Sequence, residues 1–147
     1  MYKRQEYDNK VLEVKLENTK IILPVRLQAY ERICLLLERI SLSNLIIRVN
    51  DSSFNSLQLQ QTLLSEIRNE YNHNLSQQVY MSDQSWAMTR RALEDIVSLI
   101  NTAGEQVSPE SRGIELAKKI FENQLTSNKD SVNQALSYLK AEIRTVF

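Results

Sequence analysis

The chain of 147 residues carries 18 Lys and Arg against 18 Asp and Glu, so its net charge is zero. Proteins that bind nucleic acid usually carry a surplus of basic residues, and the absence of such a surplus disfavours that function. Hydrophobic residues make up 42% and charged residues 24%, which is typical of one soluble globular domain and excludes a disordered chain. One cysteine excludes an internal disulfide, and two glycines with two prolines leave few tight turns for a sheet. The sequence therefore predicts an all-α, single-domain helical bundle of four to five main helices.

The N-terminal segment divides into two parts. The first five residues, MYKRQ, match one reading frame of a common DNA-library adapter, so we expect residues 1–5 to be a sequencing artefact ahead of a truncated start. Residues 6–23 are expected to form a stalk. Within it, Leu12, Val14 and Leu16 alternate with charged residues, which fits a strand or a helix. We favour a short helix, because no other segment could pair with a lone strand.

The bundle domain is expected at residues 24–147. Pro24 suits the first turn of a helix, because its missing N–H has no partner there. Apolar residues then recur at spacings of three and four as far as Ile40, which predicts an amphipathic helix. A short apolar segment, Leu45 to Val49, follows in a connector and could be a helical turn or an extended piece.

The middle of the chain predicts two helices. The first runs from about Asn55 towards Met81, and its polar stretch is expected to bend it near Asn72. Ser82 is the expected N-cap of the second, and Gly104 suits its end.

The C-terminal part predicts two further helices. Residues 108–110, with the sequence Ser-Pro-Glu, have the pattern of a helix start, and the last helix is expected to begin near Asp130. The predicted core includes Leu37, Ile67, Ile96, Phe121 and Leu139.

One group of residues has the spacing of a metal site. Glu66, Glu70 and His73 share a helix face, and Glu70-x-x-His73 is the spacing found in di-iron carboxylate bundles. Such a site needs two Glu-x-x-His pairs and this chain has one histidine, so we predict no metal and no cofactor. No catalytic residue is predicted either, because Cys34 lies on the apolar stripe and the chain has no nucleophile elbow or phosphate-binding loop.

A polar cluster is the candidate interaction surface. Asparagine, serine and glutamine lower the intrinsic stability of a helix relative to alanine or leucine, so their concentration in one segment calls for another explanation. They would either pair with another surface or form a bent, solvent-facing segment. The candidate surface consists of Asn72, His73, Asn74, Gln77 and Gln78.

Several separated segments resemble a known family. RLQAYERICLLLERI, EYNHNLSQQVYMS, IELAKKIFE and LKAEIRTVF are similar, in order, to uncharacterised proteins of the Bacteroidota that are classed only as a domain of unknown function. The resemblance covers about residues 10–147 and brings no activity with it. It implies an N-terminal membrane anchor that is missing here. Lys10, Lys15, Lys20 and Arg26 would then follow the membrane, on its cytoplasmic side.

Two hypotheses for the function follow. The first is a non-enzymatic, membrane-tethered interaction or scaffold domain on the cytoplasmic face of the inner membrane. It would bind an unknown protein partner, not nucleic acid, and could be a homo-oligomer. The alternative is a small-molecule or metal-binding helical domain that uses the face of Glu66, Glu70 and His73.

Overall fold

A computed structural model describes residues 2–146, and its regular elements there are helices without any strand; one isolated bridge joins Asn55 and Arg112. The all-α class is confirmed, but the described chain has six α-helices rather than four to five. They are α1 (Tyr2–Ile40), α2 (Leu42–Val49), α3 (Ser56–Asn74), α4 (Asp83–Glu105), α5 (Gly113–Ser127) and α6 (Ser131–Val146), with a 3₁₀ helix, η1 (Leu75–Tyr80), between α3 and α4.

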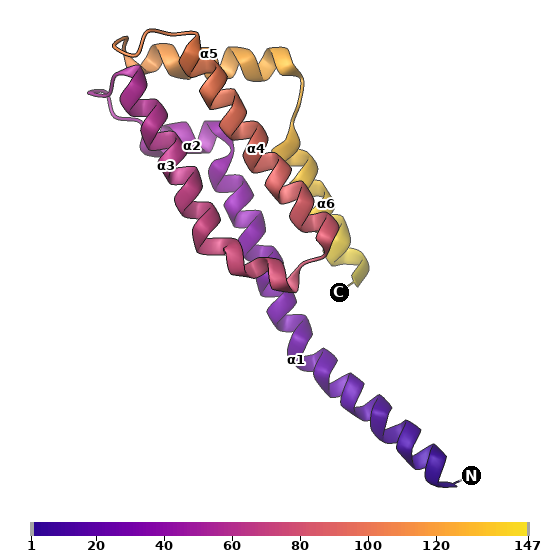
Figure 1. Ribbon diagram of the computed structural model, residues 1–147. Helices are drawn as coiled ribbons and strands as arrows, with labels where there is room; N and C mark the ends of the chain where they lie inside the picture. The colour runs from indigo at the N-terminus through magenta and orange to yellow at the C-terminus, as the bar shows by residue number, and fades with distance from the viewer. Residues whose placement is uncertain (1, 147) are drawn as a thin grey trace.

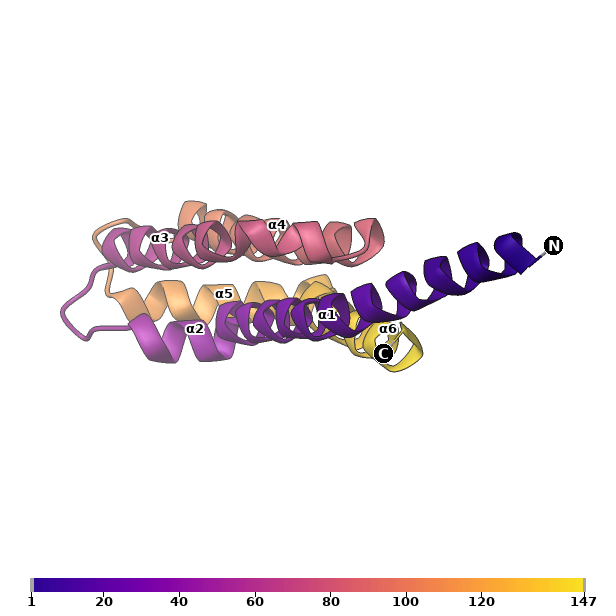
Figure 2. The ribbon, with the colours of Figure 1, turned by 90° about the horizontal axis from the view of Figure 1, so that it is seen from below.

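Four of these helices form the body of the bundle. The C-terminal half of α1 packs with α3, α4 and α6, and α4 contacts each of the other three. Figure 2 shows two layers, with α3 and α4 in one and α1, α2 and α6 in the other. The shorter α2 and α5 lie at the end of the bundle that is remote from the N-terminus (Figure 1).

The space between the helices is filled by apolar side chains. Leu37, Ile67, Ile96 and Leu139 are buried in one cluster, as predicted from their spacing. Phe121 was expected there as well, but its side chain is 36% exposed on α5. Within residues 3–145, every buried side-chain nitrogen or oxygen has a hydrogen-bond partner. Apolar side chains therefore fill the interior, and the buried polar side-chain atoms of residues 3–145 find their hydrogen-bond partners within the same chain.

The largest difference from the sequence prediction lies in α1. We expected a helix to begin at Pro24, but α1 is continuous from Tyr2 to Ile40, with Pro24 inside it. A proline in a helix interior removes one backbone hydrogen bond and crowds the preceding turn. Residues 6–17 are helical, as we favoured over a strand. A helix of this length is about 58 Å long, and its N-terminal half projects away from the other helices (Figure 1).

The junctions between the other helices are partly as predicted. The bend expected near Asn72 occurs at Asn74, where α3 gives way to η1. Ser82 caps α4, since its Oγ accepts a hydrogen bond from the Ser85 N–H at 3.1 Å. The predicted helix start at residues 108–110 is wrong, because that segment is a turn closed by the Ser111 N–H and the Ser108 carbonyl at 3.0 Å.

That turn docks on α3 instead of starting α5. The Ser56 N–H donates to the Ser111 carbonyl at 2.8 Å, and the Gly113 N–H donates to the Phe54 carbonyl at 3.0 Å. A Cβ on Gly113 would lie 3.0 Å from the Phe54 carbonyl oxygen, so this close approach of two backbones favours glycine. The first helical residue of α5 is thus fixed by a contact with a segment nearly sixty positions earlier.

Candidate interaction surface

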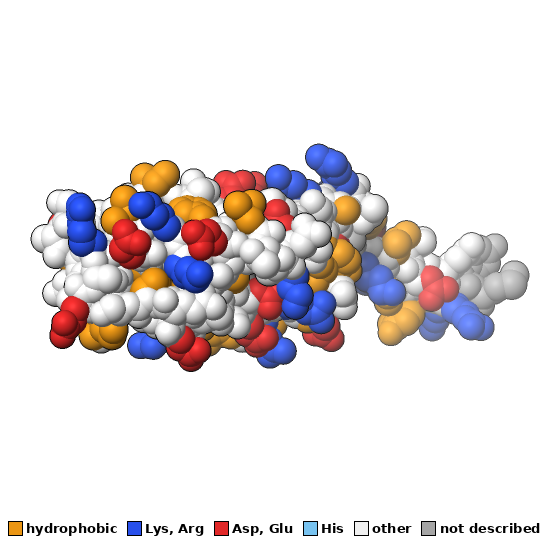
Figure 3. Space-filling view, turned by 90° about the horizontal axis from the view of Figure 1, so that it is seen from above, with side chains coloured by type: hydrophobic (Ala, Val, Ile, Leu, Met, Phe, Trp, Pro, Cys, Tyr) orange, Lys and Arg blue, Asp and Glu red, His pale blue; other side chains and the backbone are white. Residues whose placement is uncertain are grey.

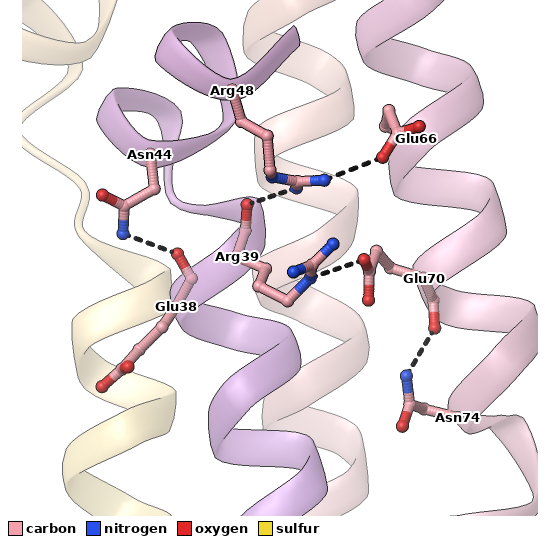
Figure 4. Close-up of polar contacts among 7 residues, drawn as sticks. All are labelled: Glu38, Arg39, Asn44, Arg48, Glu66, Glu70 and Asn74. Carbon is pink, nitrogen blue, oxygen red and sulfur yellow. Dashed lines mark hydrogen bonds and ion pairs between the residues drawn. The ribbon is translucent and has the colours of Figure 1, made fainter.

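The predicted metal-binding carboxylates are both engaged by arginines. Arg48 Nη1 lies 2.9 Å from Glu66 Oε2, and Arg39 Nε lies 2.6 Å from Glu70 Oε1. Arg48 also donates from Nη2 to the Arg39 carbonyl at 3.1 Å. Figure 4 shows the two arginines, one from α2 and one from α1, reaching across to the same side of α3. These pairs fasten the first two helices to the third.

The third predicted ligand, His73, is exposed on the last turn of α3. Within the part of the chain that the structure describes, no three His, Cys, Asp or Glu residues are grouped so that they could hold a metal ion. A cation at Glu66 and Glu70 would have to compete with the positive charges of both arginines. The spacing therefore places the two glutamates on one face, as predicted, but that face is used for ion pairs.

The polar cluster at residues 72–78 spans the junction of α3 and η1. Asn72, His73 and Gln78 are exposed, whereas Asn74 and Gln77 are half-buried. The Asn74 side chain donates from Nδ2 to the Glu70 carbonyl at 2.8 Å, where α3 ends. The segment is solvent-facing and bent, and its role as an interaction surface stays a prediction.

A cluster of hydrogen bonds around Glu142, a half-buried residue of α6, was not predicted from the sequence. The Tyr30 hydroxyl donates to Glu142 Oε1 at 2.7 Å, and the Ser82 hydroxyl donates to Oε2 at 2.9 Å. The Ser85 hydroxyl also donates to Oε2. In turn, the Tyr30 hydroxyl oxygen accepts a hydrogen bond from the Ser82 N–H at 3.2 Å. One carboxylate thereby ties α1 and the start of α4 to α6.

The charge of Glu142 is stabilised by this environment. Partial burial raises the pKa of Glu142, but the hydrogen bonds from Ser85, Tyr30 and Ser82 and the nearby charge of Arg26 lower it, and the net pKa lies below the ordinary value for glutamate. All three hydroxyl donors come from within the chain and link α1 and the start of α4 to α6. We infer a structural role for this hydrogen-bond cluster, at the end of the bundle where the stalk leaves it.

Several hollows lie between helices elsewhere, among them two that adjoin α4. A groove of about 690 Å³ between α3 and α4 has a largely apolar floor that includes Ile67, Tyr71 and Leu93 and is flanked by charged residues such as Arg68 and Glu94. A smaller hollow of about 320 Å³ lies between α4 and the α5–α6 connection. Neither includes Glu70 or His73, so neither gathers the predicted ligands.

The single cysteine lies near the middle of the bundle part of α1. Cys34 is half-buried, and burial raises the pKa of its thiol; Lys140 lowers the pKa, whereas Glu38 and Glu31 raise it further. The net pKa is above the ordinary value, which disfavours the reactive thiolate.

The N-terminal part of α1 exposes many apolar side chains. The stalk expected at residues 6–23 extends further than predicted, because Pro24, Val25 and Leu27 are also exposed, so from here on the stalk means residues 6–27 of α1. No side chain of residues 6–25 is buried, Arg26 contacts the Tyr80 carbonyl of η1, and the first buried residues of α1 are Ala29 and Tyr30. Figure 3 shows apolar side chains interspersed with charged ones along this projection. The exposed large apolar residues of the stalk are Tyr7, Leu12, Val14, Leu16, Ile21, Ile22, Val25 and Leu27.

Comparison with known proteins gives a family but no activity. The family of unknown function DUF7935 has a model that matches residues 1–146. No curated protein and no solved structure matches the chain significantly. The resemblance to a domain of unknown function is confirmed to that extent, while the Bacteroidota origin and the anchor stay predictions. Within residues 2–146, no helix is sufficiently long and apolar to cross a bilayer.

Proposed function

Because the chain belongs to this family of unknown function, we propose a function from its geometry: it is a non-enzymatic interaction domain whose stalk is the contact surface. The observation that carries the proposal is the row of exposed apolar side chains on the stalk, beside a bundle whose buried polar atoms are all paired within residues 3–145. Large exposed apolar surfaces on otherwise well-packed proteins mark sites of association.

The helix propensity of the stalk supports the same proposal. Helices without tertiary contacts are only marginally stable in water, even when they are rich in alanine. This one contains Asn9, Asn18, Thr19 and Pro24, all of which weaken a helix. A partner that covers the apolar side chains would supply the packing that the bundle does not provide.

We further propose that the protein is a scaffold tethered to the cytoplasmic face of the inner membrane. It is supported by the resemblance to anchored Bacteroidota proteins and by Lys10, Lys15 and Lys20, which would follow the anchor. Full-length protein that pellets with membranes and is released by detergent, not by salt, is the expected result. Recovery of the full-length protein in the supernatant would refute the tether while leaving the stalk proposal standing.

The alternative function, binding of a metal or small molecule by Glu66, Glu70 and His73, has less support. A cation there would compete with Arg48 and Arg39, each of which binds one oxygen of one of the two carboxylates.

The experiment is a comparison of cysteine accessibility in dilute solution and in the cell. Val14→Cys, Leu16→Cys and Gln134→Cys are made in a Cys34→Ser background; all three wild-type side chains are exposed, the last on α6. Each should react rapidly with a maleimide in dilute purified protein. In the full-length protein inside its own cells, we expect labelling at position 14 or 16 to slow at least tenfold and labelling at 134 to remain fast. Equal rates at all three positions in cells would refute the proposal.

A further inference from the structure

The apolar residues of the stalk do not surround it evenly. One set recurs at alternating spacings of four and three, which is the heptad pattern of a coiled coil. We call this set the heptad seam; it consists of Tyr7, Val11, Val14, Asn18, Ile21 and Val25. Leu12 and Leu16 belong to the other side of the helix, since two positions rotate the side chain by about 200°.

Building on the proposed function, we propose that the heptad seam pairs with the seam of a second copy of this chain in a parallel, two-stranded coiled coil. In heptad notation, Val11, Asn18 and Val25 occupy the a positions, and Tyr7, Val14 and Ile21 occupy the d positions. Five of the six seam residues are apolar, and four of them, Tyr7, Val14, Ile21 and Val25, are exposed in the single chain. The same residues would become the core of the pair.

Asn18 identifies the occupant as a second copy in parallel orientation. A single asparagine at an a position lowers the stability of a coiled coil but specifies its register and its oligomeric state. In a parallel pair, each a residue faces the same residue of the partner helix, so two Asn18 side chains can hydrogen-bond to each other. In an antiparallel pair centred on the seam, Asn18 would face Val14 and lose its polar partner.

The flanking charges neither impose nor forbid this orientation. Residues at g of one helix face residues at e of the next heptad on the other. Among the residues that follow the expected artefact at 1–5, Lys10 of one copy would therefore face Lys15 of the other, with like charge. The apolar seam and Asn18 thus carry the pairing, and the like-charged contact offers a point at which it can be strengthened.

The position of the seam leaves room for two bundles. It ends at Val25, and the next residue, Arg26, donates from Nε to the Tyr80 carbonyl of η1 at 3.3 Å. Contact between α1 and the rest of the bundle therefore begins where the seam stops. Because the N-terminal half of α1 projects clear of the other helices (Figure 2), a second stalk can lie against it while both bundles extend beyond the same end.

The test uses two substitutions that are matched in exposure and differ in helix face. Val14 is 56% exposed and belongs to the seam, whereas Leu16 is 54% exposed and lies outside it. Sedimentation equilibrium of the 147-residue chain should show a monomer–dimer equilibrium. Val14→Asp should raise the dimer dissociation constant at least about 100-fold, because a carboxylate in the seam loses water without gaining a partner. Leu16→Asp should change it less than about threefold.

Orientation is tested separately by disulfide formation. In a Cys34→Ser background, Ile21→Cys should form a covalent dimer under mild oxidation, because d positions face each other in a parallel pair. An antiparallel pair would bring position 21 opposite position 11, so Ile21→Cys alone would stay monomeric under denaturing conditions. That result would overturn the parallel arrangement.

Three further outcomes would overturn the pairing itself. The first is a monomer at every concentration, and the second is a dimer that is insensitive to Val14→Asp. The third is equal loss of the dimer in both aspartate variants, since the heptad face would then have no special role. Circular dichroism melting of each variant checks that the bundle is intact. If the chain is monomeric but position 14 or 16 is still protected in cells, the proposed function stands with a different partner.

Discussion

At the scale of single residues, Glu142 joins groups that are far apart in the sequence. Tyr30 was predictable as a core residue from its place on an apolar stripe, and Ser82 was predictable as a helix cap. Their shared contact with Glu142 was not, because it links positions 112 and 60 residues apart. Apolar periodicity and cap chemistry are local signals, and a carboxylate on a helix face gives no local sign that three hydroxyls will converge on it.

Glu142 should make the stability of the bundle depend on pH. A carboxylate whose folded-state pKa is lowered contributes stability above its unfolded-state pKa, and this contribution is lost as the pH falls through the folded-state pKa. Glu142→Gln should therefore lower the free energy of unfolding by about 1–2 kcal/mol at pH 7. The difference in the free energy of unfolding between wild type and Glu142→Gln should shrink as the pH falls below 4.5, the ordinary pKa of glutamate.

The measurement is urea unfolding of both proteins between pH 7 and pH 3. Tyr30→Phe removes one of the donors and should reproduce part of the loss, while Tyr138→Phe, on the exposed side of α6, should not. A Glu142→Gln difference that stays constant down to pH 3 would contradict the role of the charged carboxylate.

His73 should be dispensable for folding. Its side chain is exposed at the end of α3, so His73→Ala should change the free energy of unfolding by less than about 0.5 kcal/mol. Leu63→Ala, on the buried side of the same helix, should cost about 2–5 kcal/mol because it leaves a cavity. Urea unfolding of the two variants checks both values. A large loss in His73→Ala would mean that the histidine is networked in the interior.

At the scale of elements, the helices were predictable and several of their boundaries were not. The apolar spacing that predicted a helix up to Ile40 reflects contacts that the structure contains, and the low helix propensity near Asn72 marks a real bend. The two Pro-containing start signals failed, for different reasons. Pro24 is tolerated within α1, where neighbouring residues are exposed, and the Ser-Pro-Glu segment at 108–110 is held as a turn by its contacts with α3.

The exposure of particular apolar residues also could not be predicted from the sequence. Phe121 and Leu125 have the spacing of a buried face on α5, yet both are exposed. The helix α5 lies across the end of the bundle (Figure 1) and contacts α3 and α4. Spacing identifies which residues share a face, and the position of the helix in the fold decides which of them become buried.

Pro24 provides a test of the continuity of α1. Pro24→Ala restores an N–H that can donate to the Lys20 carbonyl, and alanine is favoured over proline by about 3 kcal/mol in a helix interior. We expect stronger amide protection over residues 20–28, measured by hydrogen exchange, and an unchanged melting temperature of the bundle. Asn9→Ala, elsewhere on the stalk, is the control and should leave those amides unchanged. Weaker protection around residue 24 would show that the proline terminates the helix in solution.

At the scale of the whole molecule, the chain combines a packed bundle with a projecting stalk. The sequence predicted a stalk before the bundle, but not that its apolar residues would lack contacts within the chain. Leu12 and Leu37 look alike as members of apolar repeats, although one is exposed and the other is buried. The difference depends on where α3, α4 and α6 end, which is a property of the assembled fold. The polar segment at residues 72–78 was locatable from composition, and its role as an interaction surface stays a prediction.

The charges beside the heptad seam allow the pairing to be strengthened. Lys15→Glu would convert two Lys10–Lys15 repulsions between the copies into attractions, which should lower the dimer dissociation constant about tenfold in low salt. The gain should largely vanish in 1 M salt, where exposed charges are screened. Lys20→Glu makes the same change in net charge away from the seam. Sedimentation equilibrium measures the dimer dissociation constant of each variant, and only Lys15→Glu should lower it. Equal changes in both variants would indicate a response to net charge alone.

The most direct test of the account is hydrogen exchange of the 147-residue chain at two concentrations, one below and one well above the dimer dissociation constant. The bundle segments of α1, α3, α4 and α6 should be protected equally in both samples. Amides of residues 7–25 should exchange rapidly in the dilute sample and become at least tenfold slower in the concentrated one. Stalk protection that does not change with concentration, or a bundle that exchanges as fast as the stalk, would contradict it.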